Sequence, residues 1–177
     1  MKRLAVLALV LGLAGGCASM KINSDYAREA DFSKYKTFQF KETDVTIADT
    51  QPLAHQRLVE GIERELEGKG LQKSNNPDVY VTYHGEDKEG MSLDTTHFGY
   101  GYGPGWYWGG GMGTTTTQVR TYTVGTLIVD IWDAKAKQLV WRGIASDTLS
   151  DNPQKNQQLA AKALAKMFEK YPPPTGS

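Results

Sequence analysis

One stretch of the chain decides the fold: residues 120–146, RTYTVGTLIVDIWDAKAKQLVWRGIAS. Its first part is rich in β-branched and aromatic residues, which favour strands. Residues 133–137 then predict a short hairpin connection, after which Gln138–Ser146 returns as the antiparallel partner. Alternation places two sets of side chains on opposite faces of the first strand: Leu127, Val129 and Ile131 on one face, and Ile128, Asp130 and Trp132 on the other.

The acidic side chains of this hairpin are candidates for catalysis, because a glycosidase needs two carboxylates at a fixed separation across a cleft. Asp130 lies within a strand, where Arg142 of the neighbouring strand is placed to pair with it. Asp133 fits the start of the hairpin turn instead. A further acidic cluster, residues 86–89, fits a solvated loop. We therefore expect structural roles for these acids.

Strand and helix patterns alternate on the N-terminal side of the hairpin. Lys36–Phe40 predicts a strand, and Val79–Tyr83 predicts another. Between them, Pro52 suits the first turn of a helix over Leu53–Lys69, and Gly70 suits the left-handed position that ends it. A strand–helix–strand order predicts a crossover connection and a parallel pair of strands.

A second helix is predicted after the hairpin. Asn152 and Pro153 supply a cap and a first-turn proline, apolar residues recur at helical spacing as far as Tyr171, and residues 172–174 are prolines, which stop a helix. Each helix has only one apolar face, so both are expected to pack on the same side of the sheet. The predicted fold class is α+β, a two-layer sandwich in which two helices cover one face of a mixed, mostly antiparallel sheet.

Length and composition limit the remaining possibilities. The 177 residues, 40% of them hydrophobic, suffice for one domain with a core and are short for two. Because 20 Lys and Arg residues balance 20 Asp and Glu residues, we do not expect nucleic acid as a partner. The single cysteine excludes a disulfide framework and a cysteine-rich metal site. We expect one α+β domain over residues 25–174.

The N-terminus has the layout of a bacterial lipoprotein signal peptide. Two basic residues precede an apolar run, residues 4–13, which is too short for a membrane span of roughly 20 residues. Three small residues then precede Cys17, an order that resembles a lipobox, although Ala14 stands where leucine is usual. We expect a signal peptide over residues 1–16 and acylation of Cys17; an ordinary secretory signal is the alternative.

Lipidation would determine where the protein resides. Acyl chains on Cys17 would anchor the chain in a membrane, with residues 17–24 as anchor and tether. The next residue is Ala18 rather than aspartate. By resemblance to lipoproteins of bacteria with two membranes, this favours the outer membrane, with the body facing the periplasm.

Residues 98–112, FGYGYGPGWYWGGGM, are unusual in composition, with six aromatic residues and seven glycines among fifteen. Lying between two strands, they predict a long flexible hairpin loop over residues 85–118. Three interpretations stay open: an insertion without specific function, a contact surface for a partner protein or the membrane interface, and a set of glycan-stacking platforms. The contact residues would be Tyr102, Trp106, Tyr107 and Trp108.

No motif for catalysis, metal binding or cofactor binding is present in the sequence. His55, His84 and His97 lack the spacing of a ligand set, and H-E-x-x-H, C-x-x-C and calcium-loop patterns are absent. There is no G-x-S-x-G, and the glycine-rich stretch has no phosphate-binding register. We expect no metal, no cofactor and no enzymatic activity; a hydrolase with a dispersed site is the remaining catalytic alternative.

Several short segments recur in a recognisable order. They are Asp25-Tyr26, residues 31–38, Lys69-Gly70-Leu71, residues 77–81, Gly125-Thr126-Leu127, residues 140–143 and Tyr171-Pro172-Pro173. Their order and spacing resemble the bacterial lipoprotein family called domain of unknown function 4136, from about Asp25 to Pro173. The resemblance implies an exported, lipid-anchored α+β domain. It carries over no catalytic residues, since the family has no assigned activity.

These observations together predict a non-enzymatic, lipid-anchored protein of the cell envelope that binds a protein partner or maintains the envelope. The first alternative is a module that binds glycan, either peptidoglycan or lipopolysaccharide. The second is the dispersed-site hydrolase.

Overall fold

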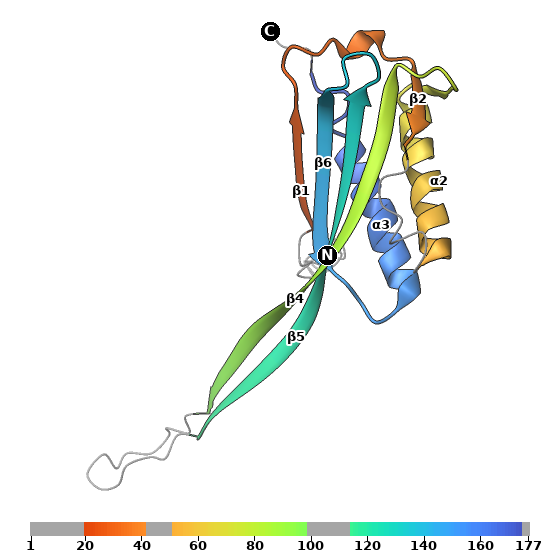
Figure 1. Ribbon diagram of the computed structural model, residues 1–177. Coiled ribbons are helices and arrows are strands. Elements are labelled where there is room, and N and C mark those ends of the chain that lie inside the picture. The colour runs from red at the N-terminus through yellow and green to blue at the C-terminus, as the bar shows by residue number, and fades with distance from the viewer. Residues whose placement is uncertain (1–19, 42–50, 99–113, 175–177) are drawn as a thin grey trace, which may run out of the picture.

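A mixed six-stranded sheet carries two helices on one face (Figure 1). The computed structural model describes residues 20–41, 51–98 and 114–174. The strand order across the sheet is β1-β6-β5-β4-β2-β3. In chain order the elements are β1 (Lys21–Tyr26), the 3-10 helix η1 (Phe32–Lys34), β2 (Thr37–Phe40), α2 (Pro52–Gly68), β3 (Gln72–Lys73), β4 (Val79–Phe98), β5 (Thr114–Asp133), β6 (Leu139–Thr148) and α3 (Pro153–Phe168).

The pairing of the strands confirms both the predicted hairpin and the predicted crossover. β5 and β6 are antiparallel neighbours, and the register places Asp130 opposite Arg142. β2 and β4 are parallel, with Phe38 opposite Val79, and α2 lies between them in the chain. β1 completes one edge of the sheet as the antiparallel partner of β6.

Local signals set the helix ends. The Asn152 side chain accepts hydrogen bonds from two backbone N–H groups of the first turn of α3, at 2.9 and 3.3 Å, and so caps that helix. Gly70 follows α2 with φ of +86°, a conformation that costs glycine little. α3 ends at Phe168, so the helical pattern predicted as far as Tyr171 extends too far, although Tyr171 is buried.

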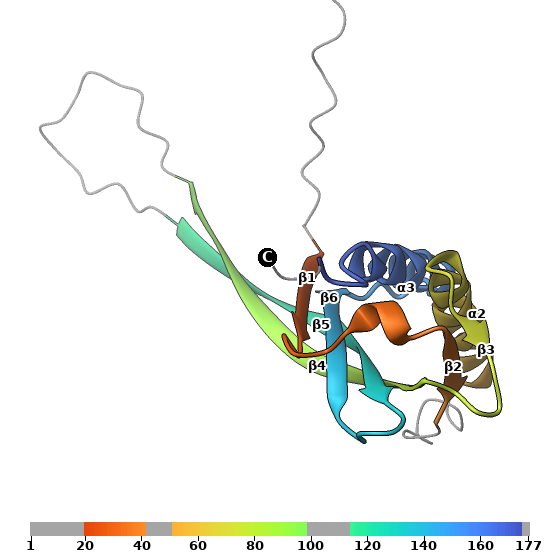
Figure 2. The same ribbon diagram turned by 90° about the horizontal axis from the view of Figure 1, so that it is seen from above.

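The core lies between the sheet and the two helices, and Figure 2 shows both helices on the same side. Its centre is an aromatic cluster in which the buried Trp141 ring lies 5.4 Å from Phe168 and 5.3 Å from Tyr171, centroid to centroid. Buried aliphatic side chains surround it, among them Ile62 and Leu66 of α2, Leu164 and Met167 of α3, and Val81, Val129 and Ile131 of the sheet. This is the predicted two-layer α+β arrangement.

The flexible loop predicted over residues 85–118 is not what the structure has in the part it describes. β4 continues to Phe98 and β5 begins at Thr114, and the two remain paired as antiparallel partners. The register places threonines opposite one another, at Thr95↔Thr117 and Thr96↔Thr116. Threonine has a high strand propensity, which favours the continuation of β4 and β5 beyond the other strands of the sheet. Residues 99–113 lie outside the described part of the chain.

One end of the domain gathers several elements. β1, α2 and α3 all begin there, and the extended part of β4 and β5 leaves from the same end (Figure 1). Met20, Ala54 of α2, Asn156 of α3 and Asp87 of β4 line a common pocket, which confirms that they are neighbours. Because Met20 is three residues after Cys17, this end is the one that adjoins the N-terminal segment.

Candidate interaction surface

The extended part of β4 and β5, here called the ribbon (residues 89–98 and 114–123), is the most distinctive surface of the protein. β2 pairs with β4 only as far as Phe40↔Val81, and β6 pairs with β5 only from Val124↔Thr148 onward. From Glu89↔Thr123 to Phe98↔Thr114, no other described strand pairs with β4 or β5, and the Leu149 N–H donates to the Thr123 carbonyl at the base of the ribbon. At ~3.4 Å per residue, the ribbon projects about 30 Å from the sheet.

One face of the ribbon carries exposed apolar side chains. Met91 is 73% exposed, and Val119 is 61% exposed. The register places Met91 opposite Thr121 and Val119 opposite Leu93, so both apolar residues lie on the same face. Within the domain, this face of β4 and β5 packs against the helices through Val81 and Val129. Along the ribbon no described helix covers it.

The opposite face is organised around Tyr122. Its ring lies across Gly90 of the other strand, its register partner, so that a Cβ on Gly90 would meet the ring Cζ at 2.6 Å. Glycine therefore allows the aromatic ring to lie flat on the neighbouring backbone. Tyr122 remains 40% exposed, so it presents an amphipathic ring to the surroundings.

Little within the described part of the chain stabilises this ribbon. A two-stranded ribbon in water is marginally stable at best. Its outer edges present backbone N–H and C=O groups that can pair with an added strand. At its base, Lys88 and Glu86 approach within 3.9 Å, but both side chains are largely exposed, so this ion pair contributes little.

The residues predicted for contact or lipidation lie outside the described part of the chain. They are Cys17, Tyr102, Trp106, Tyr107 and Trp108. The last four belong to the segment that connects the two strands of the ribbon, between Phe98 and Thr114. Among the described residues, the candidate interaction surface is therefore the ribbon.

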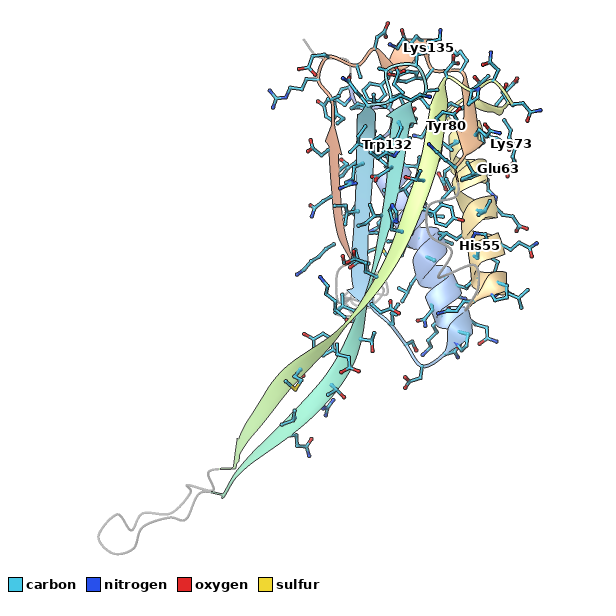
Figure 3. All side chains as sticks on the ribbon, viewed as in Figure 1. His55, Glu63, Lys73, Tyr80, Trp132 and Lys135 are labelled. Carbon is cyan, nitrogen blue, oxygen red and sulfur yellow. The ribbon has the colours of Figure 1, made fainter. Side chains whose placement is uncertain are left out.

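The acidic residues that were candidates for catalysis have structural partners. Asp130 is 1% exposed, and both of its carboxylate oxygens accept hydrogen bonds from the Arg142 guanidinium, from Nε and from one terminal nitrogen, each at 2.6 Å. This bidentate pair confirms the predicted cross-strand partner. By strand alternation, Asp130 lies on the face of the sheet away from the helices, as does Trp132, which is labelled in Figure 3. The indole N–H of Trp132 donates to the Thr82 hydroxyl at 3.2 Å.

Asp133 also has the structural role predicted for it, at the start of the hairpin turn. One carboxylate oxygen accepts from the backbone N–H groups of Lys135 and Ala136, both at 2.8 Å, and the other accepts from the Tyr35 hydroxyl at 2.9 Å. The Ala136 N–H, followed by the Tyr35 hydroxyl, lowers the pKa of Asp133. Burial, reinforced by this hydrogen bond, raises the pKa of Tyr35 above its ordinary value. The hydrogen bond between Tyr35 and Asp133 therefore connects the β5–β6 turn to the residue that follows η1.

His55 has a partner within the fold. His55 of α2 contacts the hydroxyl of Tyr83 on β4, which joins the helix to the sheet. Among the described residues, no group of three His, Cys, Asp or Glu side chains is placed to hold a metal ion. In the same part of the chain, no helix has both the length and the apolar character that a membrane crossing requires.

Comparison with known proteins places this fold in a family. A family model described as "Domain of unknown function (DUF4136)" matches residues 22–173. The chain belongs to the DUF4136 family. This agrees with the resemblance drawn from the short segments of the sequence. No curated protein matches the DUF4136 chain significantly.

Solved structures similar to the DUF4136 chain are distant in sequence. A PDZ domain protein from Parabacteroides distasonis is 17% identical, with a TM-score of 0.58 over 86% of this chain. The chain spans only 35% of that protein, so the likeness concerns the fold alone. Two crystal forms of the PelC dodecamer from Paraburkholderia phytofirmans are 14% and 13% identical, covering 85% of this chain and 95% of PelC, with TM-scores of 0.44 and 0.45.

The sequence analysis placed Met91 in the predicted loop and Tyr122 in the strand predicted from Arg120, and it assigned no contact role to Met91, Val119 or Tyr122. A signal was present, because the threonines of residues 114–117 lead directly into the strand pattern of residues 119–132. The glycine-rich segment obscured it, since the loop was predicted to extend over residues 85–118, including these threonines. What could not be inferred is that residues 89–98 supply the matching strand.

Proposed function

We propose that this DUF4136 chain is a non-enzymatic, lipid-anchored protein of the cell envelope that uses the ribbon to bind a protein partner. The ribbon is the observation that carries the proposal. An exposed two-stranded ribbon with apolar Met91 and Val119 on one face and Tyr122 on the other gains stability when a partner covers it. Its unpaired edges also allow the partner to add a strand.

The lipid anchor is supported by the N-terminal sequence. The apolar run, the small residues and Cys17 follow one another in lipobox order, and Ala18 favours the outer membrane. An anchor beside Met20 would hold the base of the ribbon near the membrane, because both lie at the same end of the domain. The ribbon could then reach a membrane-bound or periplasmic partner.

Photocrosslinking tests the partner. A benzophenone amino acid is introduced in cells at Val119 of the full-length chain, with an exposed position on α3, Gln158, as the matched control. We expect a discrete protein adduct from position 119 that position 158 does not give. No adduct, or the same adducts from both positions, would exclude the ribbon as a binding surface. Adducts with glycan or lipid alone would favour the alternative binding functions.

Metabolic labelling tests the anchor separately. Cells fed an alkyne-bearing fatty acid should label the wild-type chain, and Cys17→Ser should abolish the label and release the protein from the membrane fraction. Density fractionation should place the labelled chain in the outer membrane. Labelling that survives in Cys17→Ser would contradict acylation at this residue.

A further inference from the structure

An apolar cavity of about 200 Å³ lies between the sheet and the helices, at the end of the domain where the ribbon leaves. It opens to the surface. Its apolar lining includes Met20, Leu58, Leu127, Leu149, Leu159 and Ala163. Because the hollow is open, its apolar side chains meet water unless an apolar group covers them.

Small residues account for the cavity. Ala145 on β6 and Ala160 and Ala163 on α3 line it where the sheet and α3 face each other, and no large side chain fills the space. A dry apolar cavity of about 150 Å³ is large enough to bind a benzene ring. By proportion, about 200 Å³ accommodates roughly eight carbon atoms of an alkyl chain.

The cavity adjoins a charged groove. A second hollow of about 390 Å³ lies between α2 and α3, and it shares Ala54, Leu58, Asn156 and Ala160 with the apolar cavity. The groove is lined by charged side chains of both signs on α2: Arg57, Glu60, Arg64 and Glu65. Charged side chains beside an apolar hollow are an arrangement that suits an amphiphile.

The sequence position of Met20 brings this cavity close to the predicted lipid. Met20 lies three positions after Cys17, and a fully extended chain spans at most ~3.6 Å per residue, or about 11 Å in all. If Cys17 is acylated, the cavity therefore lies within reach of the membrane surface. This placement rests on the anchor proposed above, whereas the shape and lining of the cavity do not.

We propose that this cavity binds one acyl chain of a lipid, either from the protein's own anchor or from the surrounding bilayer. Asp87 and Asp147 also line the cavity. Their carboxylates would repel the carboxylate of a free fatty acid, whereas an ester-linked or amide-linked chain carries no charge at that point. The ligand is thus an acyl chain within a larger lipid.

Photolabelling with two lipid probes tests the proposal on the full-length protein. In one arm, the purified protein is added to vesicles of phosphatidylethanolamine and phosphatidylglycerol that contain a phosphatidylcholine with a diazirine in its acyl chain. In the other arm, cells are fed a diazirine fatty acid so that the anchor itself carries the probe. After irradiation, mass spectrometry locates the adducts. We expect them on the peptides that contain Leu58 and Leu159.

Filling the cavity should abolish these adducts. Ala160→Phe places a large ring in the space, and we expect at least a fivefold loss of labelling at the cavity peptides. Ala165→Phe is the matched control, because Ala165 is exposed on the same helix and lines neither hollow. Ala54→Phe, at an exposed position of α2 that lines both hollows, is the second filling variant in case Ala160→Phe fails to fold.

The outcomes separate the source of the lipid from the existence of the site. Cavity adducts in the vesicle arm alone identify a bilayer lipid, and adducts in the anchor arm alone identify the protein's own chain. Adducts confined to the ribbon or the tether, or cavity adducts that both filling variants leave unchanged, would overturn the proposal. If the fed fatty acid never appears on Cys17, the anchor is refuted, and the vesicle arm still decides on the cavity because it supplies the lipid.

Discussion

Removing the ribbon should leave the domain folded and eliminate partner binding. The variant replaces residues 90–122 with an Asn-Gly turn, so that Glu89 and Thr123 become the ends of a short hairpin. None of the buried core residues lies in the deleted interval, since the core set passes directly from Val81 to Val129. The contact from the Leu149 backbone N–H to the Thr123 carbonyl, at 2.8 Å, is retained.

The magnitude follows from two opposing contributions. Shortening the connection from about thirty residues to two amounts to roughly four halvings of its length, and at about 0.6 kcal/mol each this stabilises the folded state by about 2.4 kcal/mol. The cross-strand pairs of the ribbon are lost, and exposed pairs of this kind contribute roughly 0.2 kcal/mol or slightly more each. The free energy of unfolding should therefore change by less than about 2 kcal/mol.

Urea unfolding followed by tryptophan fluorescence measures this change. Trp132 and Trp141 remain as reporters after the deletion. Trp141→Ala serves as the destabilising control, because this ring is fully buried and its removal should cost about 3–5 kcal/mol. In cells, a partner identified by crosslinking at position 119 should co-purify with the full-length chain and not with the deletion variant.

Two results would refute this reasoning. A loss of more than about 3 kcal/mol on deletion would mean that the ribbon belongs to the cooperatively folding unit. Undiminished co-purification of the partner with the deletion variant would mean that binding takes place elsewhere on the domain.

Further substitutions test the interior. Arg142→Met should lower the free energy of unfolding by about 2–3 kcal/mol because it leaves the buried Asp130 carboxylate without its partner. Replacing both residues with apolar ones should restore part of the lost stability. No recovery in the double variant would contradict this. Asp133→Ala should lower the free energy of unfolding by about 2–3 kcal/mol at pH 7. Because hydrogen bonding lowers the pKa of this carboxyl in the folded state, the difference in stability from wild type should shrink as the pH falls below about 4. Urea titrations at pH 7 and pH 3 measure this difference. Gly143→Ala should lower the free energy of unfolding by about 2 kcal/mol or more because its Cβ would lie 2.3 Å from the buried Met167 Cγ. Gly68→Ala, whose Cβ would meet no atom within 4 Å, should raise the thermal midpoint slightly. Equal effects would show that the site beside Met167 can relax.

Elements whose signals are local can be predicted from the amino-acid sequence. Asn152 and Gly70 mark helix ends through their own capping groups, and the alternation of residues 127–132 fixes which side chains of β5 face the core. The Asp130–Arg142 pair was also predictable, because two strands joined by a short turn have a register set by that turn. The single apolar face of each helix was enough to place both helices on one side of the sheet.

Features that depend on contacts between segments distant in the sequence are visible only in the tertiary structure. The ribbon exists because residues 89–98 find a matching strand beyond a glycine-rich segment, and no local pattern states that register. The cavity lies where the first turns of α2 and α3 meet small residues of the sheet. Its size depends on how the helical layer packs on the sheet. Hydrophobic periodicity determines which face of an element is buried, whereas the space left between two buried faces appears only once both are in place.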